Sequence, residues 1–192
     1  MDTTQLRLML ANHNEWLLSH GQRGRKANFQ NADLKSADFR LANLQEVDFS
    51  NSDLREVEFS EGDFSLSNFE FANLQFSIFM NSNLKNANFH NADLLATDLI
   101  NSDLENANFV DCDLYSADLT NSNLIGANFT RAKLISATIT GCIIDSSTIM
   151  SNWIIENIRC EYYWSSKSKS KRIPATGKFG VGEFESKYTI HS

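Results

Sequence analysis

The chain has 192 residues, of which 42% are hydrophobic and 21% are charged, with one proline and 14 phenylalanines. This length predicts one domain with a sizeable core, and the composition excludes a disordered or linker-rich chain. The net charge of −7 argues against a general nucleic-acid binder, and no apolar run approaches the ~18 residues that a membrane helix needs. Because Met1 to Ala11 has no basic region, we expect no secretory signal, and three cysteines favour a reducing cytoplasm.

Residues 3–20 are predicted to form one amphipathic helix. Its apolar residues recur at helical spacing and share one face: Leu6, Met9, Leu10 and Leu17. Thr3 or Thr4 is a suitable residue to cap the start of this helix, and Gly21 and Gly24 mark its end.

A five-residue repeat occupies residues 27–151. Its centre is a large apolar residue, found at every fifth position from Phe29 to Ile149, which gives 25 repeats without insertion or deletion. Ten centres are Phe, twelve are Leu and three are Ile, so no centre is polar. A small residue stands two positions before the centre, and Asp or Asn stands directly before it in 19 of the 25 repeats.

A period of five fits neither a helix nor a continuous strand. In a helix the centres would spiral around all faces, and in a strand each odd step would reverse the face. The repeat therefore predicts a short extended segment and a bend, with the centre and the small residue pointing inward and the Asx residue bonded to its own backbone. Because centres twenty residues apart match in kind, as Phe29, Phe49 and Phe69 do, we expect four repeats per coil. The predicted fold is an all-β, four-sided solenoid of about six coils, roughly 30 Å long.

The repeat resembles the consensus Ala-(Asp/Asn)-Leu-x-x of the pentapeptide repeat family, as in Ala32-Asp33-Leu34-Lys35-Ser36. The resemblance implies a right-handed quadrilateral β-helix over residues 27–151, and it implies a scaffold rather than a particular activity. An open solenoid end exposes backbone edges and core. We therefore interpret residues 1–26 as an N-terminal α-helical cap; the alternative is a partner-binding helix.

Residues 152–192 depart from the repeat and are interpreted as a C-terminal cap and tail. Trp153 to Ile155 and Cys160 to Trp164 are apolar enough to plug the end of the solenoid. The stretch from Ser165 to Arg172 is polar and basic and is expected to be a loop. The last stretch is similar to tails of some bacterial, notably cyanobacterial, members of the family.

No arrangement of residues in the sequence predicts catalysis, a cofactor or a metal site. His13 and His20 lie two helical turns apart, too far for one metal, and are interpreted as helix-surface residues. Cys112 and Cys142 occupy the small inward position and are predicted to be buried fillers. The glycines at 177, 180 and 182 lack the preceding strand and following helix of a dinucleotide site. We therefore expect that the protein is not an enzyme.

Acidic residues concentrate on the solenoid, where 18 acids and 6 bases give residues 27–151 a net charge of −12. Two adjacent faces carry stacked carboxylates, among them Asp93 and Asp113 on one face and Asp98 and Asp118 on the next. Stacked like charges are unfavourable, which makes these residues candidates for a partner-binding site. The alternative is that they serve only as turn residues and keep the solenoid soluble.

The family resemblance also implies a sharper function for these acidic faces. Some pentapeptide repeat proteins mimic B-form DNA, bind type II topoisomerases and protect DNA gyrase from quinolones. DNA carries about one charge per 1.7 Å, so that a stretch of ~30 Å carries roughly 18. The 18 acids of the solenoid are comparable in number.

Apolar residues also occupy outward positions of the later coils. Leu95, Tyr115 and Ile135 stack in one column, and an exposed patch of this kind usually marks a contact. We expect Phe179 and Phe184 of the tail to fold back over this column; the alternatives are a homodimer or a foreign protein. A second outward cluster is expected in the middle of the chain: Phe71, Phe76, Ile78 and Met80.

The sequence therefore predicts a non-enzymatic scaffold that presents rigid β-helix faces to a protein partner in the cytoplasm, as a monomer or homodimer. We expect no cofactor, no metal, no direct binding of nucleic acid and no membrane contact. The alternative is an acidic DNA mimic that binds DNA gyrase and modulates its inhibition. The candidate partner-binding residues are Asp93, Asp98, Asp113, Asp118, Leu95, Tyr115 and Ile135.

Overall fold

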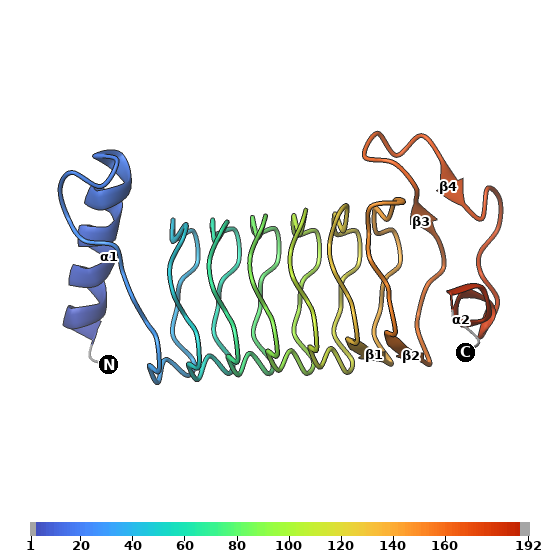
Figure 1. Cartoon of the computed structure of the whole chain (residues 1–192), viewed down its shortest axis with the longest axis horizontal. Helices are drawn as coiled ribbons and strands as arrows, with labels where there is room; N and C mark the ends of the chain where they lie inside the picture. The colour runs from blue at the N-terminus through green and yellow to red at the C-terminus, as the bar shows by residue number, and fades with distance from the viewer. Residues whose placement is uncertain (1–2, 189–192) are drawn as a thin grey trace.

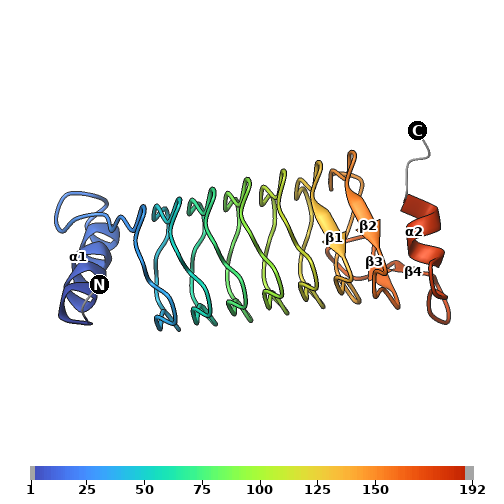
Figure 2. The same cartoon turned by 90° about the horizontal axis from the view of Figure 1, so that it is seen from below.

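The computed structural model describes residues 3–188, which form an elongated rod (Figure 1). Helix α1 (Thr3–Leu18) lies at one end of the rod and helix α2 (Glu183–Tyr188) lies at the other. Within the described residues, short strands are found only near the C-terminal end: β1 (Lys133–Ile135), β2 (Ile154–Glu156), β3 (Tyr163–Trp164) and β4 (Arg172–Ile173). Between α1 and β1 the chain winds through stacked coils (Figure 2), which isolated parallel β-bridges join.

Each regular coil contains four pentapeptides. Parallel bridges join residues twenty positions apart, for example Asn28 with Asp48 and Asp48 with Asn68. Backbone hydrogen bonds follow the same step, because the Phe29 N–H donates to the Asp48 carbonyl at 2.7 Å. A five-residue repeat that returns every twenty residues has four sides. The predicted four-sided solenoid is therefore confirmed.

The corners of the regular coils are β-turns that the repeat encodes. After Phe29, the Ala32 N–H donates to the Phe29 carbonyl at 3.0 Å, and Asn31 at the third turn position has a φ of 58°. A positive φ at this position is the type II arrangement, which favours Asn and Gly. The Asn28 Oδ1 accepts a hydrogen bond from the Gln30 N–H at 2.8 Å. The residue before the centre therefore bonds its own backbone, as predicted.

The repeat centres stack into columns that form the core. Phe89 and Phe109 are both 0% exposed, and their rings are stacked with centroids 5.0 Å apart. The small inward residues fill the space between coils and satisfy backbone carbonyls. Cys112 Sγ donates to the Phe89 carbonyl at 2.7 Å, and Cys142 Sγ donates to the Leu119 carbonyl at 2.9 Å. Both cysteines are therefore buried fillers, as predicted.

The predicted register is wrong at its last centre, Ile149. From this point the bridges join residues twenty-one positions apart, as Asn128 with Ile149 and Lys133 with Ile154. The extra residue is accommodated in a turn in which the Thr148 N–H donates to the Asp145 carbonyl at 3.2 Å. Ile149 is consequently 45% exposed, in the position before the centre.

The ladder of bridges also continues beyond residue 151, where the repeat was predicted to end. Met150 packs partly buried against the core in place of Ile149. Ile155 of β2 pairs in parallel with Leu134 of β1, and Trp164 bridges Ile143. Residues 149 and 150 are both large and apolar. Ile149 therefore fits the five-residue spacing in the sequence, although Met150 is the residue that packs against the core.

Helix α1 packs its predicted apolar face against the first coil. Leu6, Met9 and Leu10 are partly buried against the core. The helix ends at Leu18, two residues before the predicted end, and the left-handed backbone of His20 follows with a φ of 52°.

His13 is buried, contrary to the prediction of a surface residue, whereas His20 is exposed. The His13 side chain is 0% exposed, and its Nδ1 accepts a hydrogen bond from the Ala27 N–H at 3.2 Å. Its ring stacks on Trp16 with centroids 5.7 Å apart. Burial lowers the pKa of His13, and the charge of Lys26 lowers it further. The segment that joins α1 to the first coil creates this burial, which the helical pattern does not encode.

The tail packs across the C-terminal end of the rod and leaves the column of Leu95, Tyr115 and Ile135 free. Phe184 of α2 is 1% exposed, and its ring centroid lies 6.3 Å from that of Tyr163. Phe179 stacks on the same Tyr163 ring at 6.3 Å. The prediction that these phenylalanines fold back over the column is therefore wrong. The open end of the rod offers more apolar core surface than one corner does. Packing the aromatic residues there therefore buries more apolar area.

Residues 165–171 of the predicted basic loop lie between β3 and β4, which pair antiparallel through Tyr163 and Ile173, whereas Arg172 belongs to β4 and pairs with Trp164. The loop reaches back along the rod, so that the Lys167 Nζ lies 2.6 Å from the Glu105 Oε2. Neither helix of the described chain is long and apolar enough to cross a bilayer.

Candidate partner-binding surface

The structure brings all seven predicted site residues together at one corner of the rod. Leu95, Tyr115 and Ile135 follow their repeat centres directly and stack along this corner. The Ala96 N–H donates to the Tyr115 carbonyl at 2.8 Å, and the Ser116 N–H donates to the Ile135 carbonyl at 2.9 Å. This ladder keeps the three side chains in one line along the axis of the rod.

The four aspartates border that line on both sides. Asp93 bridges Asp113 on the face before the corner, and Asp98 bridges Asp118 on the face after it. Each carboxylate also accepts a backbone N–H: the Leu95 N–H donates to Asp93 at 3.1 Å and the Ile100 N–H donates to Asp98 at 2.9 Å. The aspartates are therefore held in place by the turn itself.

Phe76 extends the apolar line by one coil and was not assigned to it from the sequence. Its N–H donates to the Leu95 carbonyl at 2.9 Å, and its side chain is 52% exposed. Phe76 occupies the second position after its centre, whereas Leu95 occupies the first, so sorting the sequence by repeat position separates them. We call Phe76, Leu95, Tyr115 and Ile135 the apolar column. The apolar column and its four flanking aspartates together are the Tyr115 corner.

The residues of the second predicted apolar cluster are divided between different corners. Phe71 and Phe76 lie on consecutive corners of the same coil, because each follows a different repeat centre. Phe71 packs instead on His90, with ring centroids 6.0 Å apart. Phe76 and Ile78 lie at the Tyr115 corner, where Ile78 bridges Asp98 one coil before it.

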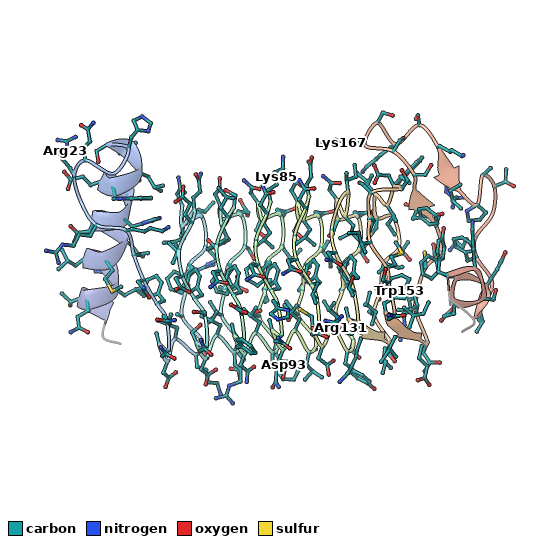
Figure 3. All side chains as sticks on the ribbon, in the orientation of Figure 1. Arg23, Lys85, Asp93, Arg131, Trp153 and Lys167 are labelled. Atoms are coloured by element: carbon teal, nitrogen blue, oxygen red, sulfur yellow. The ribbon has the colours of Figure 1, made fainter. Side chains whose placement is uncertain are left out.

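The cations of the chain lie mainly on other parts of the rod. Lys85 Nζ lies 3.1 Å from Asp103, Lys167 pairs with Glu105, and Arg131 pairs with Asp111 at 2.6 Å. Figure 3 shows Lys85 and Lys167 along one edge of the rod and Asp93 on the opposite edge. The negative charges on those parts of the surface are therefore neutralised by ion pairs within the chain.

At the Tyr115 corner, few cations of the described chain neutralise the charges of the aspartates. Asp113 pairs with Lys133 at 3.9 Å, and Asp93 accepts a hydrogen bond from the Gln75 amide at 2.6 Å. Asp98 and Asp118 form no ion pair within residues 3–188. Burial raises the pKa of Asp98, and the neighbouring charge of Asp118 raises it further. This corner therefore combines exposed apolar surface with two carboxylates, those of Asp98 and Asp118, that form no ion pair within residues 3–188.

Metal-ligating side chains do not cluster within residues 3–188, and the three thiols are buried. No group of three or more His, Cys, Asp or Glu within residues 3–188 could hold a metal ion. Burial raises the pKa of Cys112 and Cys142 and raises that of Cys160 to about 12, so the thiols stay protonated at neutral pH. A groove of about 620 Å³ lies between α1 and the first coil, lined by apolar and charged side chains that include Leu10 and Asp33.

Comparisons with known proteins point to one family. The model described as "Pentapeptide repeat region" matches residues 72–149, and the model described as "Pentapeptide repeats (8 copies)" matches residues 25–60. A comparison with curated proteins finds no match.

Several solved structures are similar to the chain. HetL, a pentapeptide repeat protein involved in heterocyst differentiation regulation in the cyanobacterium Nostoc, is 14% identical, with coverage of 80% of this chain and 95% of HetL and a TM-score of 0.39. QnrB1, a plasmid-mediated fluoroquinolone resistance protein, is 14% identical, with coverage of 69% and 81% and a TM-score of 0.37. A pentapeptide repeat protein from the Arabidopsis thaliana thylakoid lumen is 27% identical, with coverage of 52% and 69% and a TM-score of 0.32.

Proposed function

The chain is a pentapeptide repeat protein, and from this premise we propose that it is a non-enzymatic scaffold that binds a protein partner through the Tyr115 corner. Proteins of this family are right-handed quadrilateral β-helices, whose repeats build a rigid rod and leave function to surface side chains. The observation that carries the proposal is the apolar column bordered by aspartates. Neither feature is needed to form the coil, because other repeats place Asn or Ser at equivalent positions.

The apolar column supports a contact with another molecule. Phe76 and Tyr115 are 52% and 44% exposed, and the tail that was expected to cover Tyr115 packs elsewhere. Contiguous exposed apolar surface stabilises an interface when it is covered, and aromatic residues are enriched in interface cores. The ring of Tyr115 adds a hydroxyl group that can hydrogen-bond at such an interface.

The aspartates support a partner with positive charge rather than a nucleic acid or an anionic membrane. Residues 27–151 carry a net charge of −12, which repels phosphates at short range. Carboxylates that flank an apolar contact steer a cationic partner to it and fix its orientation. We place this function in a reducing compartment such as the cytoplasm, since the three cysteines are free and buried.

The test is retention of a partner by the immobilised full chain and by its variants. Tyr115→Asp adds a charge to the apolar column and is expected to abolish retention. Phe71→Asp adds the same charge at another corner, where Phe71 is 54% exposed, and is expected to retain the partner. Equal retention by Tyr115→Asp and the wild-type chain would show that the Tyr115 corner is not the binding surface.

A second candidate function is mimicry of DNA at a type II topoisomerase such as DNA gyrase. The observation that favours it is the pair of acidic columns, in which Asp93 stacks on Asp113 and Asp98 on Asp118. Replacing these four residues with Asn keeps the Oδ1 that accepts the backbone N–H and removes the charge. If mimicry is the function, the wild-type chain alters gyrase supercoiling or its inhibition by a quinolone, and the four-Asn variant does not. An absence of any effect by the wild-type chain would remove this candidate.

A further inference from the structure

We infer that the partner segment at the Tyr115 corner is a cationic amphipathic α-helix that lies along the axis of the rod. This inference rests on the proposed function, because it specifies the chemistry of the partner for that same surface. Three observations lead to it: the saturation of the backbone at the corner, the spacing of the apolar column, and the position of the aspartates on both sides.

The backbone of the corner has no free edge that could pair with a partner strand. The Phe76 N–H donates to the Leu95 carbonyl, the Ala96 N–H to the Tyr115 carbonyl, and the next coil continues in the same way. Addition of a strand requires a row of unpaired N–H and C=O groups. The N–H groups of the corner are already donated, either to carbonyls of the next coil or to the preceding aspartate. A partner strand finds no donors there, so a partner binds by side-chain packing, as an amphipathic helix does in a groove or on a surface.

The spacing of the apolar column matches the spacing of a helix. Phe76, Leu95, Tyr115 and Ile135 belong to four successive coils. At about 4.8 Å between neighbouring strands, the column spans about 14 Å. An α-helix has a pitch of about 5.4 Å, so apolar residues at i, i+3 or i+4, i+7 and i+11 span about 16 Å. A helix parallel to the rod axis therefore places one apolar residue near each member of the column.

The aspartates match the flanks of such a helix. Asp93 and Asp98 are five residues apart with a turn between them, so they lie no more than about 17 Å apart. A helix with its side chains is about 10–12 Å wide. Lysine or arginine residues on both flanks of the apolar stripe would therefore reach Asp93 and Asp113 on one side and Asp98 and Asp118 on the other.

The length of the apolar column sets the length of the helix. The column begins at Phe76, because the coil before it carries the Arg55–Asp53 ion pair at this corner. It ends at Ile135, next to the Lys133–Asp113 ion pair. A column of about 14 Å fits a helix of about three turns.

The experiment measures binding of a synthetic probe to the full-length chain. The probe is a peptide of about 14 residues, with leucines at helical spacing and lysines at the remaining positions. A scrambled peptide of the same composition and a peptide with Glu in place of Lys are its controls. We expect the probe to bind, to gain helical circular dichroism on binding, and to bind more weakly as NaCl rises from about 0.1 M to about 0.5 M. Binding of the scrambled peptide with equal affinity would overturn the helical geometry.

Variants of the chain locate the contact. Tyr115→Ser, and Asp98→Asn together with Asp118→Asn, are each expected to weaken binding of the probe by about tenfold or more. The matched controls carry the same kinds of change at other corners: Phe71→Ser, and Glu61→Gln together with Glu70→Gln. These controls are expected to bind within about twofold of the wild-type chain. Equal losses in both sets would mean that the peptide binds the acidic rod without using the Tyr115 corner, which contradicts the inference.

The outcomes separate this inference from the proposed function. If Tyr115→Asp abolishes retention of a partner but the helical peptide fails to bind, the corner is a binding surface for a partner of another shape and the inference fails alone. If vesicles with anionic lipid or a DNA duplex bind in place of the peptide and Tyr115→Ser removes that binding, both the inference and the choice of a protein partner fail.

Discussion

The rings of Phe89 and Phe109 lie face to face, with centroids 5.0 Å apart and an interplanar angle of 1°. The two residues are twenty positions apart in the sequence and occupy the same place in consecutive coils. This stacking repeats along one face, since Phe69 and Phe89 are 5.0 Å apart with an interplanar angle of 5°. The stacked rings therefore pack each coil against the next within the core.

Phe89→Ala is expected to destabilise the chain by about 3–5 kcal/mol, because it removes a fully buried ring and leaves a cavity between two coils. The shift of the urea unfolding midpoint measures this loss. Phe71→Ala is the matched control, since Phe71 is 54% exposed, and it is expected to change stability by about 0.5 kcal/mol or less. Similar losses for both variants would contradict the assignment of Phe89 to the core.

Gly126 occupies a turn position where the backbone is left-handed, with a φ of 69°. Gly126→Ala is expected to cost about 1–2 kcal/mol for this backbone conformation, with a further loss because the new Cβ would lie 2.1 Å from the Asn106 Oδ1. Thermal unfolding measures both contributions. Combining the substitution with Asn106→Ala is expected to recover the steric part and to leave the conformational part. If the double variant recovers nothing, Asn106 is not the obstacle.

The docking of α1 is expected to weaken as the pH falls below about 6.5. Burial lowers the pKa of His13 in the folded chain, so the unfolded chain binds the proton more readily. Stability therefore rises with pH through the interval between the folded pKa and the unfolded value, and it falls on acidification. A protonated Nδ1 also cannot accept the Ala27 N–H. Lys26 and Glu46 are the charged groups that act on His13.

Hydrogen-exchange protection factors of α1 at several pH values test the effect of His13. We expect protection to fall below pH ~6.5 in the wild-type chain and to stay constant in His13→Gln, which keeps an acceptor but does not titrate. His20→Gln changes an exposed histidine and should retain the pH dependence of the wild-type chain. Loss of the pH dependence in His20→Gln would show that His20, and not His13, causes it.

The three cysteines are expected to resist thiol reagents in the folded chain. Cys112 and Cys142 are 1% and 0% exposed, and burial raises the pKa of both thiols. Since the thiolate is the reactive form, labelling at pH ~8 should proceed only after unfolding in denaturant. Tyr115→Cys places a thiol at an exposed position and should react at once, as a positive control. Rapid labelling of the native wild-type chain would contradict the burial.

Much of the solenoid is predictable because each local signal agrees with the others. The centres Phe29 to Ile144 are buried, the Asx residues bond the turns, and the twenty-residue return follows from matching residues such as Phe89 and Phe109. The candidate site was also predictable in large part. Once the twenty-residue return is known, Leu95, Tyr115 and Ile135 must lie in one line, with the aspartates on either side.

The features that the sequence did not predict are those in which residues come together without following the five-residue spacing. Phe76 joins the apolar column from a different position in the repeat. The insertion near Asp145 shifts the register by one residue, and Met150 replaces Ile149 without any break in apolar character. Since Ile149 and Met150 are both large and apolar, the pattern alone does not choose between the two registers.

The sequence by itself determined the periodic part of this protein: which side chains point inward, where the chain turns, and which residues stack along the rod. Each five-residue repeat adopts the same local conformation, and this repetition produces the geometry whatever the distant residues are. Tertiary structure alone decided the ends and the free surface. His13 is buried because the segment after α1 folds over it, and Phe184 covers the end of the rod because that end exposes more core than the Tyr115 corner does. Those outcomes depend on competition between surfaces for the same apolar residues, and that competition is settled only when the whole chain has folded.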